Sequence, residues 1–224
     1  MENQKEKRRV VMGKYLIFIV GIILTCGTAH ADSNLIKNPG FDFKDWDQYW
    51  TESSPGATDV RKSASEYFSS PNSALFEDSN PKIERTATLF QNFAASSGLS
   101  YIAGAYIKSL SDGFSIRDGA YAYVGLGWYG DSGNIGDMKL SDYLTGANNA
   151  WSWFSLNDVA PVGTTFGRIY LNLYSPGLTG HKRTAYFDNA SVAVVPEPIS
   201  TILFLSGGAL VGGRLLLRRR KCEK

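Results

Sequence analysis

The chain contains little cysteine and little histidine, and these shortages limit the chemistry available to it. Its 224 residues include two cysteines, Cys26 and Cys222, which lie near the two ends. The middle of the chain therefore has no thiol for a disulfide or a nucleophile. His181 is the one histidine after residue 30, and no Gly-x-Ser-x-Gly motif occurs. We predict that the protein is not an enzyme, although sequence spacing leaves a paired-carboxylate glycosidase site open.

Positive charge is scarce in the middle of the chain as well. The ranges 1–31 and 196–224 hold 11 of the 23 basic and 4 of the 21 acidic residues, so 12 basic and 17 acidic residues remain in 32–195. The middle therefore has a net charge of −5, whereas the whole chain has +2. Because nucleic acid requires a basic surface, we expect no nucleic-acid partner.

The first 31 residues have the order of a secretory signal peptide. A positive region comes first, and the apolar segment 15–24 that follows is too short to span a membrane comfortably. Ala29, His30 and Ala31 then fit a small-x-small cleavage site. An uncleaved anchor is the alternative; a lipoprotein is disfavoured because Thr25 before Cys26 is a poor lipobox residue.

The last residues combine a proline pair, an apolar run and a basic tail. Pro196, Glu197 and Pro198 precede the run 199–217, which at about 19 residues is long enough to cross a hydrocarbon core. The tail that follows carries Arg218, Arg219 and Arg220, which favour the cytoplasmic side. We therefore expect a transmembrane helix in the range 196–224.

This C-terminal order resembles the PEP-CTERM sorting signal of Gram-negative bacteria. The resemblance implies an exosortase that cuts near Pro-Glu-Pro, after a translocon has exported the chain across the inner membrane. It also implies that the C-terminal helix anchors the protein in the membrane before processing. The expected destination is the cell surface or an extracellular biofilm matrix.

Between these ends the residue pattern is that of short strands separated by turns. Alternating or β-branched and aromatic segments occur at 101–107, 120–128, 168–174 and 184–195, with Gly and Ser clusters between them. We find no convincing amphipathic helix. The pattern predicts that 32–195 is one all-β domain, in which two antiparallel sheets enclose the core.

Two segments of this domain resemble a known family. The opening segment 34–42, Asn-Leu-Ile-Lys-Asn-Pro-Gly-Phe-Asp, and the closing segment 185–189, Ala-Tyr-Phe-Asp-Asn, resemble carbohydrate-binding modules of the family 4/9 type. The likeness covers nearly all of 34–194. It implies a galactose-binding-like jelly-roll sandwich. It also implies a structural calcium ion held by Asp42 and Asp188. The alternative is that these carboxylates hydrogen-bond turn backbone.

The segment 168–174 supplies the candidate binding face. Period two places Ile169, Leu171 and Leu173 on one side of a strand. The opposite side carries Arg168, Tyr170, Asn172 and Tyr174. Aromatic planes beside an arginine and an amide are what a glycan platform requires.

A second strand extends this candidate face. Tyr121, Tyr123 and Tyr129 are all at odd-numbered positions of that strand and so point to the same side. We place Trp128 near the turn of this strand as a further platform residue. Trp50 and Trp153 are expected in the core. The alternative for the tyrosines is that they pair across strands for stability.

Two functions therefore follow from the sequence. In the first, the exported sandwich binds a polysaccharide without catalysis. In the second, the protein is a structural component of the surface or matrix and has no sugar site.

Overall fold

The computed structural model describes residues 34–43, 46–53, 58–69, 71–78, 82–111, 115–177 and 181–195. The predicted signal peptide 1–31 lies outside this set, as does the predicted sorting signal with Pro196, Glu197, Pro198, Arg218, Arg219 and Arg220. The described ranges contain one short 3₁₀ helix, η1 (Trp46–Gln48). None of the helical structure in these ranges is long and apolar enough to cross a bilayer.

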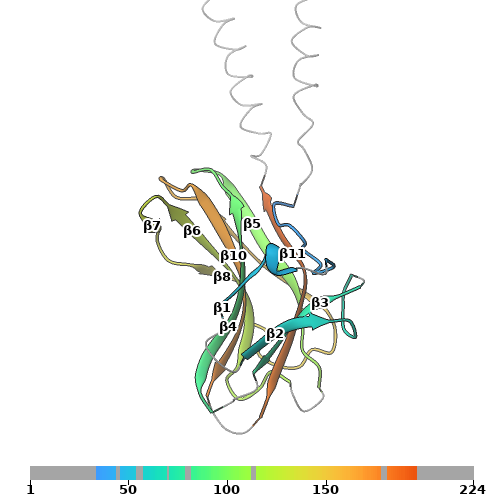
Figure 1. Ribbon diagram of the computed structural model, residues 1–224. Helices are drawn as coiled ribbons and strands as arrows, with labels where there is room; N and C mark the ends of the chain where they lie inside the picture. The colour runs from blue at the N-terminus through green and yellow to red at the C-terminus, as the bar shows by residue number, and fades with distance from the viewer. Residues whose placement is uncertain are drawn as a thin grey trace, which may run out of the picture. The chain divides into compact units, whose positions relative to one another are not determined.

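The described residues form two antiparallel sheets, as Figure 1 shows. The six-stranded sheet has the order β1 (Thr51–Ser53), β4 (Glu84–Ala94), β10 (Phe166–Pro176), β6 (Tyr121–Gly130), β7 (Gly133–Asn134), and β8 (Lys139–Leu140) also pairs with β6. The five-stranded sheet has the order β2 (Thr58–Ser63), β3 (Ser73–Asp78), β11 (Arg183–Val194), β5 (Ser100–Lys108), β9 (Ser152–Val159). The predicted all-β sandwich is confirmed, and the four predicted strands correspond to β5, β6, β10 and β11.

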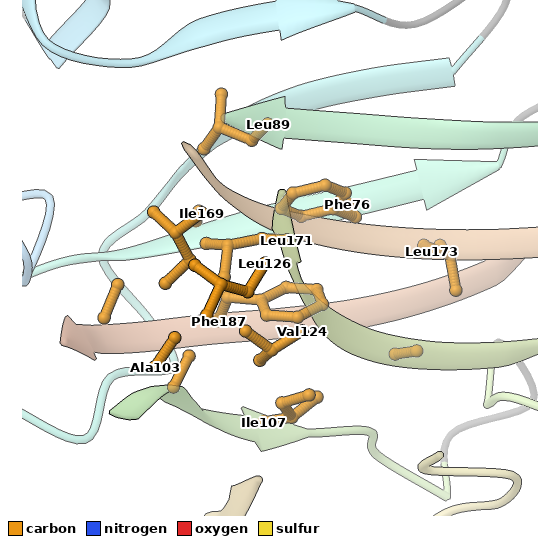
Figure 2. Packing of buried hydrophobic residues seen from close by; sticks show 14 of the residues in the cluster. Phe76, Leu89, Ala103, Ile107, Val124, Leu126, Ile169, Leu171, Leu173 and Phe187 are labelled. Atoms are coloured by element: carbon orange, nitrogen blue, oxygen red, sulfur yellow. The ribbon is translucent and has the colours of Figure 1, made fainter. Parts of the chain in front are cut away.

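The core lies between the sheets and is built by alternation along the long strands. On β10, Ile169, Leu171 and Leu173 are at most 1% exposed. They pack in one cluster with Phe76 of β3 and Phe187 of β11, which belong to the other sheet (Figure 2). The period-two prediction for this strand is therefore confirmed. Burial of this apolar surface is the main stabilising contribution to the fold.

A cluster of charged side chains is also buried between the sheets. Asp78 of β3 lies 3.3 Å from Arg85 of β4 and 3.7 Å from Arg183 of β11, measured between side-chain oxygen and nitrogen. Arg183 also donates to the hydroxyl of Ser175 on β10 at 3.0 Å. The side chains of Asp78, Arg85 and Arg183 are at most 4% exposed. Because its members come from both sheets, this cluster joins the two layers.

The two tryptophans expected in the core have different positions. Trp50 is 2% exposed, and its indole nitrogen donates to the carbonyl of Asn38 at 3.1 Å. Trp153 is 42% exposed on β9, so its expected burial is wrong. The strand is at the edge of its sheet, and the ring lies over Gly104 of β5, where an added Cβ would be 2.4 Å from it.

Candidate functional site

The outward face of the six-stranded sheet gathers the predicted platform residues of β10. The register of β4, β10 and β6 sets rows of neighbours across this face. The rows are Asn92–Arg168–Gly127, then Phe90–Tyr170–Gly125, then Thr88–Asn172–Tyr123, then Thr86–Tyr174–Tyr121. Paired residues in adjacent antiparallel strands point to the same side. Arg168, Tyr170, Asn172 and Tyr174 therefore share one face, as predicted.

Arg168 lies in a layered stack that we call the arginine stack, made of Phe90, Arg168, Tyr129 and Phe166. Its guanidinium carbon is 4.1 Å from the ring centroid of Phe90 and 4.6 Å from that of Tyr129. The Tyr129 ring is in turn stacked on Phe166, with centroids 4.9 Å apart and planes 7° apart. Cation–π attraction stabilises such an arrangement. The stack holds the guanidinium in one place on the sheet.

Tyr170 is fixed beside this stack. Its phenol group shares a hydrogen bond with that of Tyr129. Gly127 leaves room for both rings, because an added Cβ would lie 3.2 Å from the Tyr170 ring and 3.4 Å from the Tyr129 ring. Burial, followed by the hydrogen bond and charge interaction with Tyr129, raises the pKa of Tyr170 to about 12, against the opposing effect of Arg168. Tyr170 is therefore a neutral hydrogen-bonding group at physiological pH.

A second group, the tyrosine cluster, lies further along the same face and consists of Tyr121, Tyr123, Tyr143 and Tyr174. Tyr121 stacks on Tyr174 with ring centroids 4.6 Å apart, and lies equally far from Tyr143. Tyr143 comes from the segment after β8 and is 45% exposed. Burial is the largest cause that raises the pKa of Tyr123 to about 12. Tyr174 donates its hydroxyl to Glu84 at 2.8 Å.

Asn172 lies between the arginine stack and the tyrosine cluster and is 2% exposed. The Thr88 hydroxyl donates to its side-chain oxygen at 2.8 Å. Its side-chain nitrogen has no hydrogen-bond partner within the described residues. If the amide is turned over, the oxygen loses its partner instead, so one end stays unsatisfied either way. A buried polar group without a partner requires an explanation, such as a water molecule or a ligand.

A groove of about 590 Å³ adjoins the arginine stack. Phe90, Asn92 and Phe166 border it from the sheet, and Lys37, Gln48 and Tyr49 border it from the chain that precedes β1. The Gln91 side chain bonds both the backbone nitrogen and the backbone oxygen of Lys37, at 2.7 and 2.9 Å. The wall of the groove that carries Lys37 is therefore attached to β4.

Trp128 does not belong to this face, so its place among the predicted platform residues is wrong. It is 1% exposed and packs in the core against Phe93 and Tyr101. Its indole nitrogen donates to a carboxylate oxygen of Asp158 at 2.8 Å. Trp128 has the opposite parity from Tyr129, and successive side chains of a strand point to opposite sides. A ring in this position cannot stack on a sugar.

Asp188, one of the two predicted calcium ligands, is completely buried. Its carboxylate accepts hydrogen bonds from the backbone nitrogens of Phe68, Ser69 and Asn189, at 2.6 to 2.8 Å. Burial is the largest cause that raises its pKa, the Asp42 carboxylate adds to the rise, and the three amide donors oppose it. The carboxylate thus anchors turn backbone, which is the hydrogen-bonding role considered above as the alternative.

The surroundings of Asp188 fit calcium only in part. Asp42 is the acidic residue whose charge raises the pKa of Asp188. Within the described ranges, no three Asp, Glu, His or Cys side chains form a metal cluster. Calcium takes six to eight oxygen ligands, and the amide donors already use lone pairs of Asp188. The calcium site stays a prediction from the resemblance.

Several residues of this face were not singled out from the sequence. They are Phe90, Asn92, Tyr143, Phe166 and the groove residue Lys37. Phe90 and Asn92 lie on β4, whose own alternation is a usable signal, since its even-numbered residues are the less buried ones. Tyr143 and Lys37 come from segments between strands, where no periodicity predicts their position.

Comparison with known proteins shows that several solved structures share the fold of this chain. No family model matches the chain, and no curated protein matches it significantly. The CBM22-1 xylan-binding domain of Paenibacillus barcinonensis Xyn10C shares 13% identity over 76% of this chain and 100% of that domain, with a TM-score of 0.51. The enzymatically active domain of tailspike protein 4 from bacteriophage CBA120 shares 16% identity over 72% of this chain, with a TM-score of 0.56.

The CBM22-1–GH10 modules of Clostridium thermocellum Xyn10B are also similar, with 10% identity over 75% of this chain and a TM-score of 0.50. The match covers 21% of the tailspike domain and 29% of the Clostridium protein, so it concerns a part of each. At this level of identity the shared property is the β-sandwich fold. The chain is thus similar in fold to carbohydrate-binding modules, and the finer family 4/9 assignment stays a prediction.

Proposed function

We propose that the β-sandwich is a non-catalytic polysaccharide-binding module and that the ligand lies on the outward face of the six-stranded sheet. The observation that carries this proposal is that aromatic rings gather on one face around an unsatisfied amide nitrogen and an arginine without a carboxylate partner within the described residues. The arginine stack and the tyrosine cluster lie on either side of Asn172, whose side-chain nitrogen lacks a hydrogen-bond partner within the described residues. Sugar sites combine such apolar planes with a few polar groups. The fold is shared with a xylan-binding domain, which makes polysaccharides the first ligand class to test.

A structural protein without a sugar site is the second candidate, and one observation favours it. Most rings of the face contact one another, as in the stacked pair Tyr121 and Tyr174 and the hydrogen-bonded pair Tyr129 and Tyr170. Cross-strand aromatic pairs of this kind stabilise a sheet by themselves. A glycan array that includes neutral and acidic polysaccharides, probed with the full-length chain in mild detergent, separates the two candidates.

Truncating either tyrosine of β10 is expected to weaken binding. Tyr170→Ala and Tyr174→Ala should each cost roughly 1 to 3 kcal/mol of binding free energy, from the ring area lost and its stacking. Affinity is measured by isothermal titration calorimetry with a polysaccharide that the array identifies. Tyr67→Ala is the matched control, because Tyr67 is 44% exposed and lies outside this face. Unchanged affinity in both β10 variants would contradict the proposed site.

We propose further that the module is exported and sorted, on the strength of the two terminal signals in the sequence. A translocon and an exosortase are then its processing partners, and the C-terminal helix holds it in the membrane until it is cut. The mature form reaches the cell surface or the extracellular matrix. Mass spectrometry of the exported protein tests this directly. The expected form begins at Asp32 and lacks residues 199–224, and an intact chain in the outer fraction would refute the processing.

A further inference from the structure

Arg168 is held on the sheet by neutral groups. Its guanidinium carbon lies 4.1 Å from the ring centroid of Phe90, 4.6 Å from that of Tyr129 and 5.8 Å from that of Tyr170. Its Nε donates to the side-chain oxygen of Asn92 at 2.6 Å. These contacts fix the position and the plane of the guanidinium, but none of them neutralises its charge. An arginine positioned in this way is pre-organised for a planar anion.

Arg168 also differs from the other arginines of the domain. Arg61, Arg85, Arg117 and Arg183 each have a carboxylate oxygen within salt-bridge distance. Among the residues that the structure describes, no carboxylate forms such a pair with Arg168. The charge is therefore available to a ligand, although the residue is half-buried. A charge-assisted hydrogen bond to this group would be stronger than a bond between neutral groups.

A second cation, Lys37, borders the groove beside the arginine stack. Lys37 lies on the wall of the groove that Phe90 and Asn92 border from the sheet. No ion pair of Lys37 occurs within the part of the chain that the structure describes. The range 32–195 as a whole has a net charge of −5, so these two cations lie on a domain that is acidic overall. Since the overall charge repels anions, attraction at this face has to come from specific contacts.

We propose that the groove beside the arginine stack selects an acidic polysaccharide, with the carboxylate of a uronic acid bound to Arg168. This inference rests on the proposed function and names its substrate class. The planar guanidinium matches a carboxylate through two parallel N–H···O bonds. Asn92 accepts from Nε, and the Tyr170 hydroxyl also hydrogen-bonds the guanidinium. The N–H groups that remain on the terminal nitrogens can donate to the ligand. Lys37 supplies a point charge for the same residue or its neighbour along the polymer.

The test compares acidic polysaccharides with their own neutral forms. Polygalacturonate, alginate and glucuronoxylan are each used as such and after chemical reduction of the carboxylates to alcohols. Binding by the full-length chain in mild detergent is measured by affinity electrophoresis. We expect at least one acidic polymer to bind about tenfold more tightly than its reduced form, as a charged hydrogen-bonded pair predicts. Added salt should reduce this preference.

Variants then assign the preference to Arg168. Arg168→Gln should bring the affinity ratio of the acidic polymer to its reduced form close to one. Arg168→Lys should restore part of the ratio, because it keeps the charge but loses the planar fork. Arg61→Gln is the matched control; Arg61 lies on β2 of the other sheet and pairs with Glu77, so this change should leave the ratio intact. Tryptophan fluorescence shows whether each variant is folded.

The outcomes separate this inference from the proposed function. Equal binding of the acidic and reduced forms, or binding of the reduced forms alone, overturns the acidic preference and leaves polysaccharide binding standing. A preference that survives Arg168→Gln overturns the role of Arg168. If no acidic or neutral polysaccharide of the array or of this panel binds, both the inference and the proposed function fail. The comparison of wild-type affinities does not depend on any variant folding.

Discussion

Replacing Asp78 with alanine is expected to lower the free energy of unfolding by about 3 to 5 kcal/mol, the cost of breaking a buried ion pair. The reason is the position of this carboxylate between Arg85 and Arg183, at 3.3 and 3.7 Å. The side chain of Arg183 is completely buried and that of Arg85 is 4% exposed, so water cannot replace the lost carboxylate. Domains of this size have a total stability of about 5 to 15 kcal/mol, and the variant should therefore lose a large share of it.

Chemical denaturation followed by tryptophan fluorescence measures this loss. All five tryptophans lie between residues 46 and 153, so the signal reports the sandwich alone. Asp118→Asn is the matched control, because Asp118 is also near Arg183, at 3.9 Å, but its side chain is 45% exposed, and Asn tolerates the positive φ of this position. Because the Asp118 carboxylate is exposed and Asp78 still faces Arg183, losing Asp118 should cost less than about 1 kcal/mol. Similar losses in both variants would contradict a special role for the buried cluster.

The sequence predicts the strands and the orientation of β10 well, because long alternating segments have one dominant signal. In the segment 168–174 every second residue is a large aliphatic side chain, and the remaining four are polar or aromatic. Only one orientation buries Ile169, Leu171 and Leu173. The face that carries Arg168 and Tyr170 follows from that orientation without any knowledge of the partner strands.

The strand β6 has a weaker alternation signal than β10. Its residues are buried on both sides from Ala122 to Trp128, so the burial pattern of the strand hides the alternation. The side to which each residue points still follows from its odd or even position in the strand. Tyr121, Tyr123 and Tyr129 are odd-numbered and Trp128 is even-numbered, which assigns Trp128 to the opposite side. Because β6 continues to Gly130, Trp128 is a strand residue and not a turn residue, and alternation places its ring on the core side.

Other features of the site depend on tertiary contacts that no local pattern contains. The segment after β6 pairs with it through β7 and β8, two residues each, and brings Tyr143 against Tyr121. Strands this short have no periodicity to detect. The exposure of Trp153 likewise depends on β9 being the edge of its sheet, which is a matter of strand order. The burial of Asn172 also depends on tertiary contacts, because its sequence neighbours do not predict which residues cover it.

Leu171→Ala should lower the free energy of unfolding by about 2 to 5 kcal/mol, the range for truncating a buried leucine. Leu171 has no exposed surface and packs in the cluster that both sheets share (Figure 2). The loss combines the apolar area removed from the core with the cavity left behind, because close-packed neighbours relax only in part. Denaturation followed by tryptophan fluorescence gives the value.

The matched control for this substitution is Tyr174→Phe, three residues along the same strand. It removes only the hydroxyl that donates to Glu84 on the exposed face, so its cost should stay below about 1 kcal/mol, as for other exposed hydrogen bonds. The two substitutions together test the division of β10 into a core side and a binding side. Any glycan affinity of the folded Leu171→Ala protein should match that of the wild type, since the change lies on the core side. An unfolding midpoint for Leu171→Ala equal to that of Tyr174→Phe would mean that β10 does not face the core as described.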